Sequence, residues 1–172
     1  MTQRPNWGEA QEAKPWRDRF WGRQNAAMER RMTCFSLREL IVEARLGGAA
    51  VGMGRDDVRR RLGAPDEWGV EETVERASIW RYGNFELHFG EDGRCWMIFN
   101  DSAQAGLNAG PGRTLELWLF ADGPDDSVVS DRLRADGLSL DEGIECDMRR
   151  LRVGAAKLFF EHSRLAVLKV MG

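Results

Sequence analysis

The residues best suited to metal binding or nucleophilic chemistry are two histidines and three cysteines. His88 and His162 stand far apart, and Cys34, Cys95 and Cys146 form no CxxC pair. A zinc site gathers several His, Cys or carboxylate ligands, and a cysteine nucleophile needs a neighbouring base. Cys95 lies instead in an apolar segment, where a cysteine acts as a small core residue. We therefore expect no metal site, no cofactor and no catalytic residue.

Carboxylate pairs and glycine-rich segments also have plain structural explanations. Asp56 and Asp57 stand where a helix is expected to begin, and negative charge is favourable at that end of the helix dipole. The glycines of residues 106–112 lack the Lys-Ser/Thr of a phosphate-binding loop. The chain has no GxSxG or dinucleotide-binding pattern either. It is therefore predicted not to be an enzyme.

Composition is typical of an acidic globular protein. The chain has 172 residues, 42% of them hydrophobic, and a formal net charge of −3, which fits one domain or two small units that share a core. It has no run of about 18 apolar residues, and we expect no export signal, because its first residues hold no apolar stretch before a small-residue cleavage site. With an odd number of cysteines, we expect reduced thiols, a cytoplasmic location and no membrane contact. The acidic body argues against nucleic-acid binding and suits a basic partner, although such acidity is also ordinary for a bacterial protein.

Sequence patterns predict helices alternating with strands. Residues Ser36 to Glu39 form a capping box, and the helix that follows should end at Gly47-Gly48. A second short helix should bury Val58 and Leu62. A third should open at residues 123–126. Alternation and turn residues predict strands at 78–82, 85–89, 94–100, 147–153, 155–160 and 164–170, with an extra strand or bridging element at 115–120.

The chain repeats itself at a fixed offset of 71 residues. Aligning residues 50–99 with residues 121–170 gives 11 identities in 50 pairs, where chance would give roughly three. We therefore predict an α+β fold in which two tandem αβββ repeats form one antiparallel sheet, with the short helices packed on one face.

The two copies keep inward positions and change outward ones. Leu87 matches Leu158, whereas Glu86 matches Lys157. A kept inner face and a divergent outer face would suit two copies with different surface duties. Drift on a neutral surface would give the same pattern.

This organisation divides the chain into four parts. Residues 1–31 are expected to form an extended N-terminal arm rich in Arg and Trp, which docks on the body or anchors a partner. The arm should contain a short helix near residues 24–32, and Met28 and Met32 are alternative start sites. Residues 32–101 hold the first repeat with its leading helix, 102–120 a loop and a bridging strand, and 121–172 the second repeat.

A motif in the first repeat resembles two known families. The run Gly-Met-Gly-Arg-Asp-Asp-Val at 52–58, followed by Leu-Gly-Ala-Pro at 62–65, is similar to the small outer-membrane assembly lipoproteins (SmpA/OmlA) and to the tandem-repeat β-lactamase inhibitory proteins. Residues 79–94 are similar to bacterial proteins of which some are encoded beside toxins as immunity proteins. The resemblance covers residues 50–100 and, more loosely, 121–170. It implies short helices against an antiparallel sheet, and a sheet face that binds proteins.

Outward positions of the first repeat are the candidate contacts for a protein partner. Trp68 follows a Gly-Ala-Pro turn and is expected to be exposed, and Glu71 and Glu72 form an acidic loop beside it. Glu86 and His88 alternate with apolar residues and should project from the face opposite the core.

Two further tryptophans, Trp80 and Trp96, are assigned to the core. We expect a non-enzymatic, immunity-type inhibitor that binds and neutralises a toxin encoded nearby. The alternatives are a structural or assembly adaptor anchored through the arm, and a small-ligand-binding protein or enzyme with a closed polar pocket. No oligomeric state is predicted.

Overall fold

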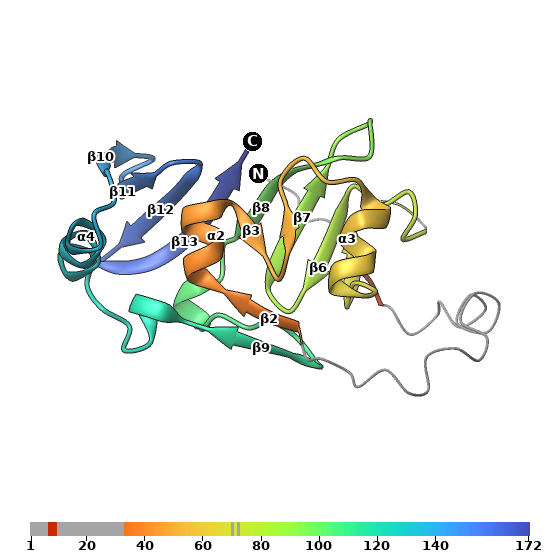
Figure 1. Cartoon of the computed structure of the whole chain (residues 1–172), viewed down its shortest axis with the longest axis horizontal. Helices are drawn as coiled ribbons and strands as arrows, with labels where there is room; N and C mark the ends of the chain where they lie inside the picture. Colours follow the sequence, from red (N-terminus) through yellow and green to blue (C-terminus); the bar gives the residue numbers. More distant parts are fainter. Residues whose placement is uncertain (1–6, 10–32, 70, 72) are drawn as a thin grey trace.

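The computed structural model describes residues 7–9, 33–69, 71 and 73–172. Within these residues, nine strands form one antiparallel sheet and three α-helices lie against it, which is an α+β architecture (Figure 1). Most of the predicted arm lies outside the described residues, including its helix near 24–32 and the alternative starts Met28 and Met32.

The sheet has the strand order β1-β5-β6-β7-β8-β13-β12-β11-β10. Two runs of consecutive strands, β5 to β8 and β10 to β13, meet at the centre, where β8 pairs with β13. We call these runs the first half and the second half. The strands are β1 Trp7–Glu9, β5 Glu67–Gly69, β6 Ile79–Tyr82, β7 Phe85–Phe89, β8 Cys95–Asn100, β10 Asp141–Glu145, β11 Met148–Val153, β12 Ala156–Glu161 and β13 Arg164–Met171.

Each half contributes four strands to the sheet rather than the three predicted. Strands β6 to β8 and β11 to β13 lie where the alternation predicted them, and β5 and β10 are additional. Strand β5 has only three residues. Strand β10 reads Asp-Glu-Gly-Ile-Glu, which lacks the apolar alternation of a predictable strand. Pairing with a longer neighbour therefore makes both segments extended.

Helix α2 (Leu37–Glu43) begins as predicted but ends early. The Ser36 hydroxyl accepts a hydrogen bond from the Glu39 N–H at 3.4 Å, which is the capping contact. The helix stops because Ala44 adopts a left-handed φ of 55°. Gly47 and Gly48, expected to end it, instead turn a short hairpin between β3 (Arg45–Leu46) and β4 (Ala49–Ala50).

Helices α3 (Arg55–Leu62) and α4 (Asp126–Ala135) carry the predicted buried stripes. Val58 and Leu62 are buried on α3, and Val129 and Leu133 on α4. No α-helix in the described part of the chain is both long and apolar enough to cross a membrane.

The predicted bridge at residues 115–120 is a short strand followed by a helical turn. Strand β9 (Arg113–Glu116) pairs in parallel with β2 (Thr33–Ser36), apart from the main sheet, and the 3-10 helix η3 (Trp118–Phe120) follows. Arg113 ties β9 to the rest of the fold, because its guanidinium donates to the Asp66 carboxylate at 3.0 Å and lies 4.7 Å over the Tyr82 ring.

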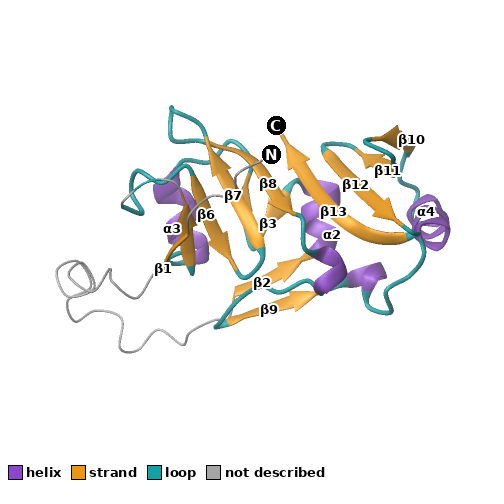
Figure 2. Cartoon of the chain, turned by 180° about the vertical axis from the view of Figure 1, so that it is seen from behind, coloured by secondary structure: helices purple, strands orange, loops and turns teal. Residues whose placement is uncertain are grey.

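The main hydrophobic core lies between the helices and one face of the sheet. Leu40 of α2, Val58 of α3 and Leu133 of α4 belong to one buried cluster with Leu87 and Leu158 of the sheet. Seen from behind in Figure 2, β6 and β7 lie in front of α3. We call the face that carries Leu87 and Leu158 the inner face, and the opposite one the outer face.

Candidate protein-binding face

The outer face consists of every second side chain along the strands, since successive residues of a strand point to opposite faces. Leu87 belongs to the main core, so Glu86 and His88 project from the outer face. Ile79, Met97 and Phe159 are buried without belonging to the main core cluster, which gives the outer face an apolar layer of its own. The three described helices bury their apolar residues in the main core, so none of them covers this layer.

A cluster of rings lies on the first half of the outer face. His88 Nε2 is 3.0 Å from Glu86 Oε2. The His88 ring meets the Trp96 and Phe99 rings edge-on, each at a centroid distance of 6.0 Å. Trp96 is 46% exposed, whereas Glu86 and His88 are largely buried. Tryptophan is enriched at binding hot spots, so this ring is a candidate contact for a binding partner.

A row of directly paired side chains crosses the outer face. In the first half, the strand register pairs Glu67 with Arg81, Arg81 with Glu86, and Glu86 with Phe99. The Arg81 guanidinium also bonds the Glu67 carboxylate at 3.0 Å. Acidic and basic groups therefore alternate in this half.

The same row continues through the second half with a different charge pattern. Phe99 pairs with Lys169, Lys169 with Lys157, Lys157 with Arg152, and Arg152 with Asp141. Three cations thus lie side by side on β13, β12 and β11. We call the whole line, from Glu67 to Asp141, the central row.

Trp68 is not an exposed contact, so that prediction is wrong. It lies on β5 directly opposite Trp80 and packs in the main core, at 8% exposed. Its polar neighbours in the sequence indicated a loop, but pairing with β6 turns its ring inward. Trp80 is a core residue, as predicted.

The predicted core position of Trp96 is also wrong, because its side chain is 46% exposed. In the pairing of β7 with β8, Phe89 faces Cys95 and His88 faces Met97, so Trp96 is an extra residue without a partner. Such a β-bulge bends the strand and re-aims its side chain. The bulge explains why Trp96 is exposed although its neighbours in the strand, Cys95 and Met97, are buried.

In the described part of the acidic loop, Glu71 bonds to a neighbouring residue of the chain itself. The Glu71 carboxylate accepts hydrogen bonds from the Ser78 N–H at 2.8 Å and from the Ser78 hydroxyl at 3.4 Å. Glu72 lies outside the described residues. Of the five predicted contacts, the structure brings only Glu86 and His88 together on the outer face.

The residues singled out for chemistry lie apart from one another. Cys95 is fully buried in the main core, as predicted, and burial raises the pKa of its thiol to about 12. His162 is exposed in the turn between β12 and β13, also as predicted. Among the described residues, no group of three or more His, Cys, Asp or Glu side chains could hold a metal ion.

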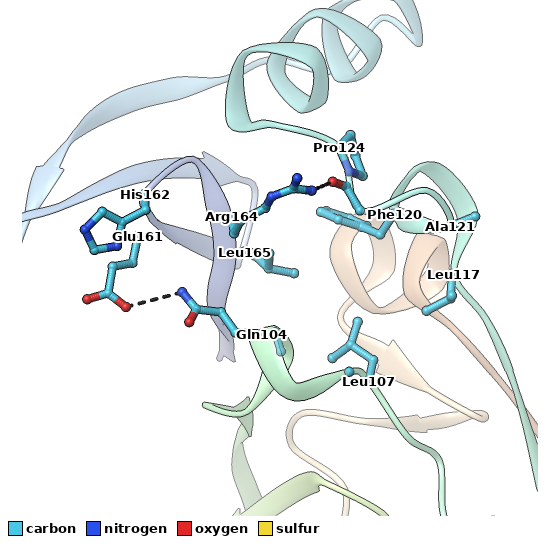
Figure 3. A pocket seen from close by; sticks show the side chains of 13 residues that line it. Gln104, Leu107, Leu117, Phe120, Ala121, Pro124, Glu161, His162, Arg164 and Leu165 are labelled. Atoms are coloured by element: carbon cyan, nitrogen blue, oxygen red, sulfur yellow. Dashed lines mark hydrogen bonds between the residues drawn. The ribbon is translucent and has the colours of Figure 1, made fainter.

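A groove of about 610 Å³ lies at one end of the second half (Figure 3). Two polar contacts lie in its lining: Gln104 Nε2 donates to Glu161 Oε2 at 3.2 Å, and the Arg164 guanidinium donates to the Gly123 carbonyl. The exposed His162 side chain lines the groove as well. Its described lining includes no Ser, Thr or Cys that could act as a nucleophile. The apolar part of the lining is formed by residues such as Leu107, Leu117, Phe120 and Leu165.

Sequence reasoning missed Trp96 and Lys169 on the outer face. The turn between β12 and β13 is one residue shorter than the turn between β7 and β8, because Phe160 faces Leu165 whereas Phe89 faces Cys95. An ungapped offset therefore matches Lys169 with an inner-face residue. An alignment of the two copies with a one-residue gap at this turn would match Lys169 with Phe99 and place it on the outer face.

Comparison of the chain with protein-family models, with curated protein sequences and with solved structures finds no match. The resemblances noted for residues 50–100 and 121–170 therefore stay predictions.

Proposed function

We propose that this chain is a non-enzymatic protein-binding module that uses its outer face to bind a partner protein. The observation that carries the proposal is the exposed Trp96 ring beside His88 and Phe99, on a face that the described helices leave uncovered. Covering an exposed apolar ring is favourable by roughly 25 cal/mol for each Å² removed from water. A partner that covers Trp96 therefore gains affinity from a side chain that is already held in position by its neighbours.

The partner that we propose is a toxin encoded beside this chain, which the chain would neutralise in the cytoplasm as an immunity-type protein. Support for this class comes from the resemblance of residues 79–94 to immunity proteins and from the outer face, where the Trp96 ring is exposed and no described helix packs. Enzyme and cofactor sites are concave and enclose a small ligand, whereas an open sheet face suits a second macromolecule. Polar groups such as Glu86 and Lys157 around an apolar centre are typical of such an interface.

We further propose that the two halves are tandem copies of one αβββ unit. In favour of this, α3 and α4 begin 71 residues apart, and so do β7 and β12. Gly83 and Gly154, one offset apart, both turn the chain with left-handed φ values of 61° and 55°.

The central pairing supports the same proposal. Each half has a β-bulge at the same place, with Trp96 unpaired on β8 and Ala166 unpaired on β13. Across the β8–β13 boundary, Asn100 faces Leu168 and Ile98 faces Val170, so the pairing is symmetric about the Phe99–Lys169 pair. A duplicated unit that meets its copy across a local two-fold axis has this arrangement.

The test is a binding titration between this chain and the purified product of the adjacent gene, followed by calorimetry. We expect one-to-one binding that is weakened about tenfold or more by Trp96→Ala, together with loss of the partner's toxicity when the two are co-expressed. Ile144→Ala is the matched control, because Ile144 is 81% exposed but pairs with Arg149 on the inner side of β10. Unchanged binding by Trp96→Ala would remove the outer face from the proposal.

The same titration separates the alternative functions. An assembly adaptor anchored through the arm would lose its partner when residues 1–31 are deleted, whereas binding through the outer face should survive that deletion. A small-ligand-binding protein would use the groove, whose volume of about 610 Å³ is typical of ligand pockets. Leu107→Trp, which fills the groove, should then abolish stabilisation by small molecules and leave partner binding unchanged.

A further inference from the structure

The second half of the central row places three cations on adjacent strands of the outer face. Lys169 directly faces Lys157, and Lys157 directly faces Arg152. Neighbouring strands lie roughly 4.8 Å apart, so the three charges line up within roughly 10 Å. Like charges directly opposite one another destabilise a sheet, so this arrangement does not serve the fold.

Only one of the three cations is neutralised by a carboxylate. The Lys157 ammonium bonds the Glu145 carboxylate at 3.0 Å. Arg152 donates to the Gly154 carbonyl at 3.2 Å, and the carboxylate of Asp141, which it faces across the strands, bonds to Arg150 instead at 3.0 Å. The Lys169 side chain makes no ion pair or hydrogen bond with the residues that the structure describes.

The matching positions of the first half carry a single cation, Arg81, which stands where the second half has Arg152. Glu86 stands where the second half has Lys157, and Phe99 stands where it has Lys169. The only cation of that half of the row, Arg81, bonds to Glu67. The cationic stretch is therefore a local feature of one half, on a chain whose net charge is −3.

We infer that Arg152, Lys157 and Lys169 recognise an acidic segment of the partner protein, with the half-buried Phe99 beside Lys169 as an apolar contact. This inference rests on the proposed function, because it names the chemistry of the partner that the outer face binds. It reverses the expectation that an acidic body suits a basic partner. A nucleic acid fits less well, because the net negative charge of the chain repels a long polyanion.

The first experiment measures binding of the full chain to the product of the adjacent gene. Lys169→Glu should weaken binding about tenfold or more, and wild-type affinity should fall between about 50 and 300 mM salt. The matched control is Arg38→Glu on α2, an exposed cation on the helix side of the sheet, which should change affinity less than about twofold. Lys169→Glu also places a carboxylate opposite Lys157, so its Tm should stay level or rise, and misfolding cannot explain lost binding.

The outcomes of this experiment distinguish a failure of the inference from a failure of the proposed function. If Trp96→Ala loses binding while Lys169→Glu does not, the outer face binds the partner but the acidic segment is wrong. If neither variant changes binding, the proposed function fails and the inference fails with it.

A second experiment tests the inference if the product of the adjacent gene does not bind. The ¹⁵N-labelled chain is titrated with the capped peptide Glu-Phe-Glu-Phe-Glu and, separately, with the oligonucleotide dT12. Shifts at the amides of Arg152, Lys157 and Lys169 with the peptide, lost in Lys169→Glu, support the inference. Tighter binding of dT12 at the same amides, or no shift there with either probe, overturns it.

Discussion

At the first turn of α4, Asp126 is held as a carboxylate by Arg149, whose guanidinium donates to it at 2.7 Å. Burial raises the pKa of Asp126, but the hydrogen bond and the charge of Arg149 outweigh it and hold the pKa below the usual 3.8. The group also lies at the positive end of the helix dipole, where a negative charge is favourable. The interaction therefore stabilises only the folded state with an ionised carboxylate.

We expect Asp126→Asn to lower the free energy of unfolding at neutral pH by about 1.5 kcal/mol, the usual worth of a hydrogen bond to a charged group. Because the folded-state pKa is lowered, this difference should persist above pH 3.8 and shrink as the pH falls through that lowered pKa. Urea unfolding of both proteins across this pH range measures it. A difference that does not depend on pH would contradict the assignment.

The three cysteines should differ sharply in reactivity. Cys34 and Cys146 are exposed, whereas Cys95 is buried and its thiol has a pKa of about 12. The thiolate is the reactive form, so iodoacetamide near pH 8 should label two thiols quickly and Cys95 only after unfolding. Mass spectrometry of the native and urea-unfolded protein checks this, with Cys95→Ala as the control that lacks the slow site. Equal labelling of all three thiols in the native protein would be inconsistent with this burial.

Individual side chains show where sequence patterns succeed. Alternation with Leu87 placed Glu86 and His88 on the outer face, because strand geometry alone decides that outcome. Trp68 and Trp96 were assigned the wrong way round, since their orientation depends on pairing with β6 and on a bulge opposite β7. Neither feature has a local sequence signal.

At the scale of elements, the corresponding turns at Gly83 and Gly154 offer a matched pair. Both glycines have left-handed φ values, but a Cβ on Gly83 would lie 2.1 Å from the Asn108 carbonyl oxygen, whereas a Cβ on Gly154 would meet nothing within 4 Å. We expect Gly154→Ala to cost about 1 kcal/mol for the backbone alone. Gly83→Ala should cost about 3 kcal/mol, because the segment at 108–110 must also move. Urea midpoints measure both, and equal losses would contradict the close approach.

Helices and strands were predictable where a local pattern specifies them. The stripes of α3 and α4 and the alternation of β7 each appear within one short window of sequence. The end of α2 was not predictable from the sequence. Ala44 adopts a left-handed conformation that its side chain does not favour, and the hairpin that follows imposes this conformation. Strands β5 and β10 likewise become extended because they pair with β6 and β11. Local signals therefore define the centre of each half, and tertiary pairing defines its edges.

At the scale of the whole molecule, the two halves share one sheet and one core. Strands β8 and β13 are hydrogen-bonded at the centre of the sheet. Leu87 of the first half and Leu158 of the second are both fully buried in the same cluster, which also contains residues of all three described helices. Neither half can unfold without exposing the core face of the other, so the described body should unfold as one cooperative unit.

Leu87→Ala and Leu158→Ala test this cooperativity at corresponding positions. Each should cost about 3 kcal/mol, because each removes a fully buried side chain and leaves a cavity. Hydrogen exchange at the amides of β7 and β12 reports each half separately during urea unfolding. In a cooperative molecule, either substitution lowers the midpoint at both strands by the same amount, while Val128→Ala on the exposed side of α4 changes it by less than about 0.5 kcal/mol. If Leu158→Ala lowered the midpoint at β12 alone, the halves would be independent units, and the outer face could not act as one rigid surface.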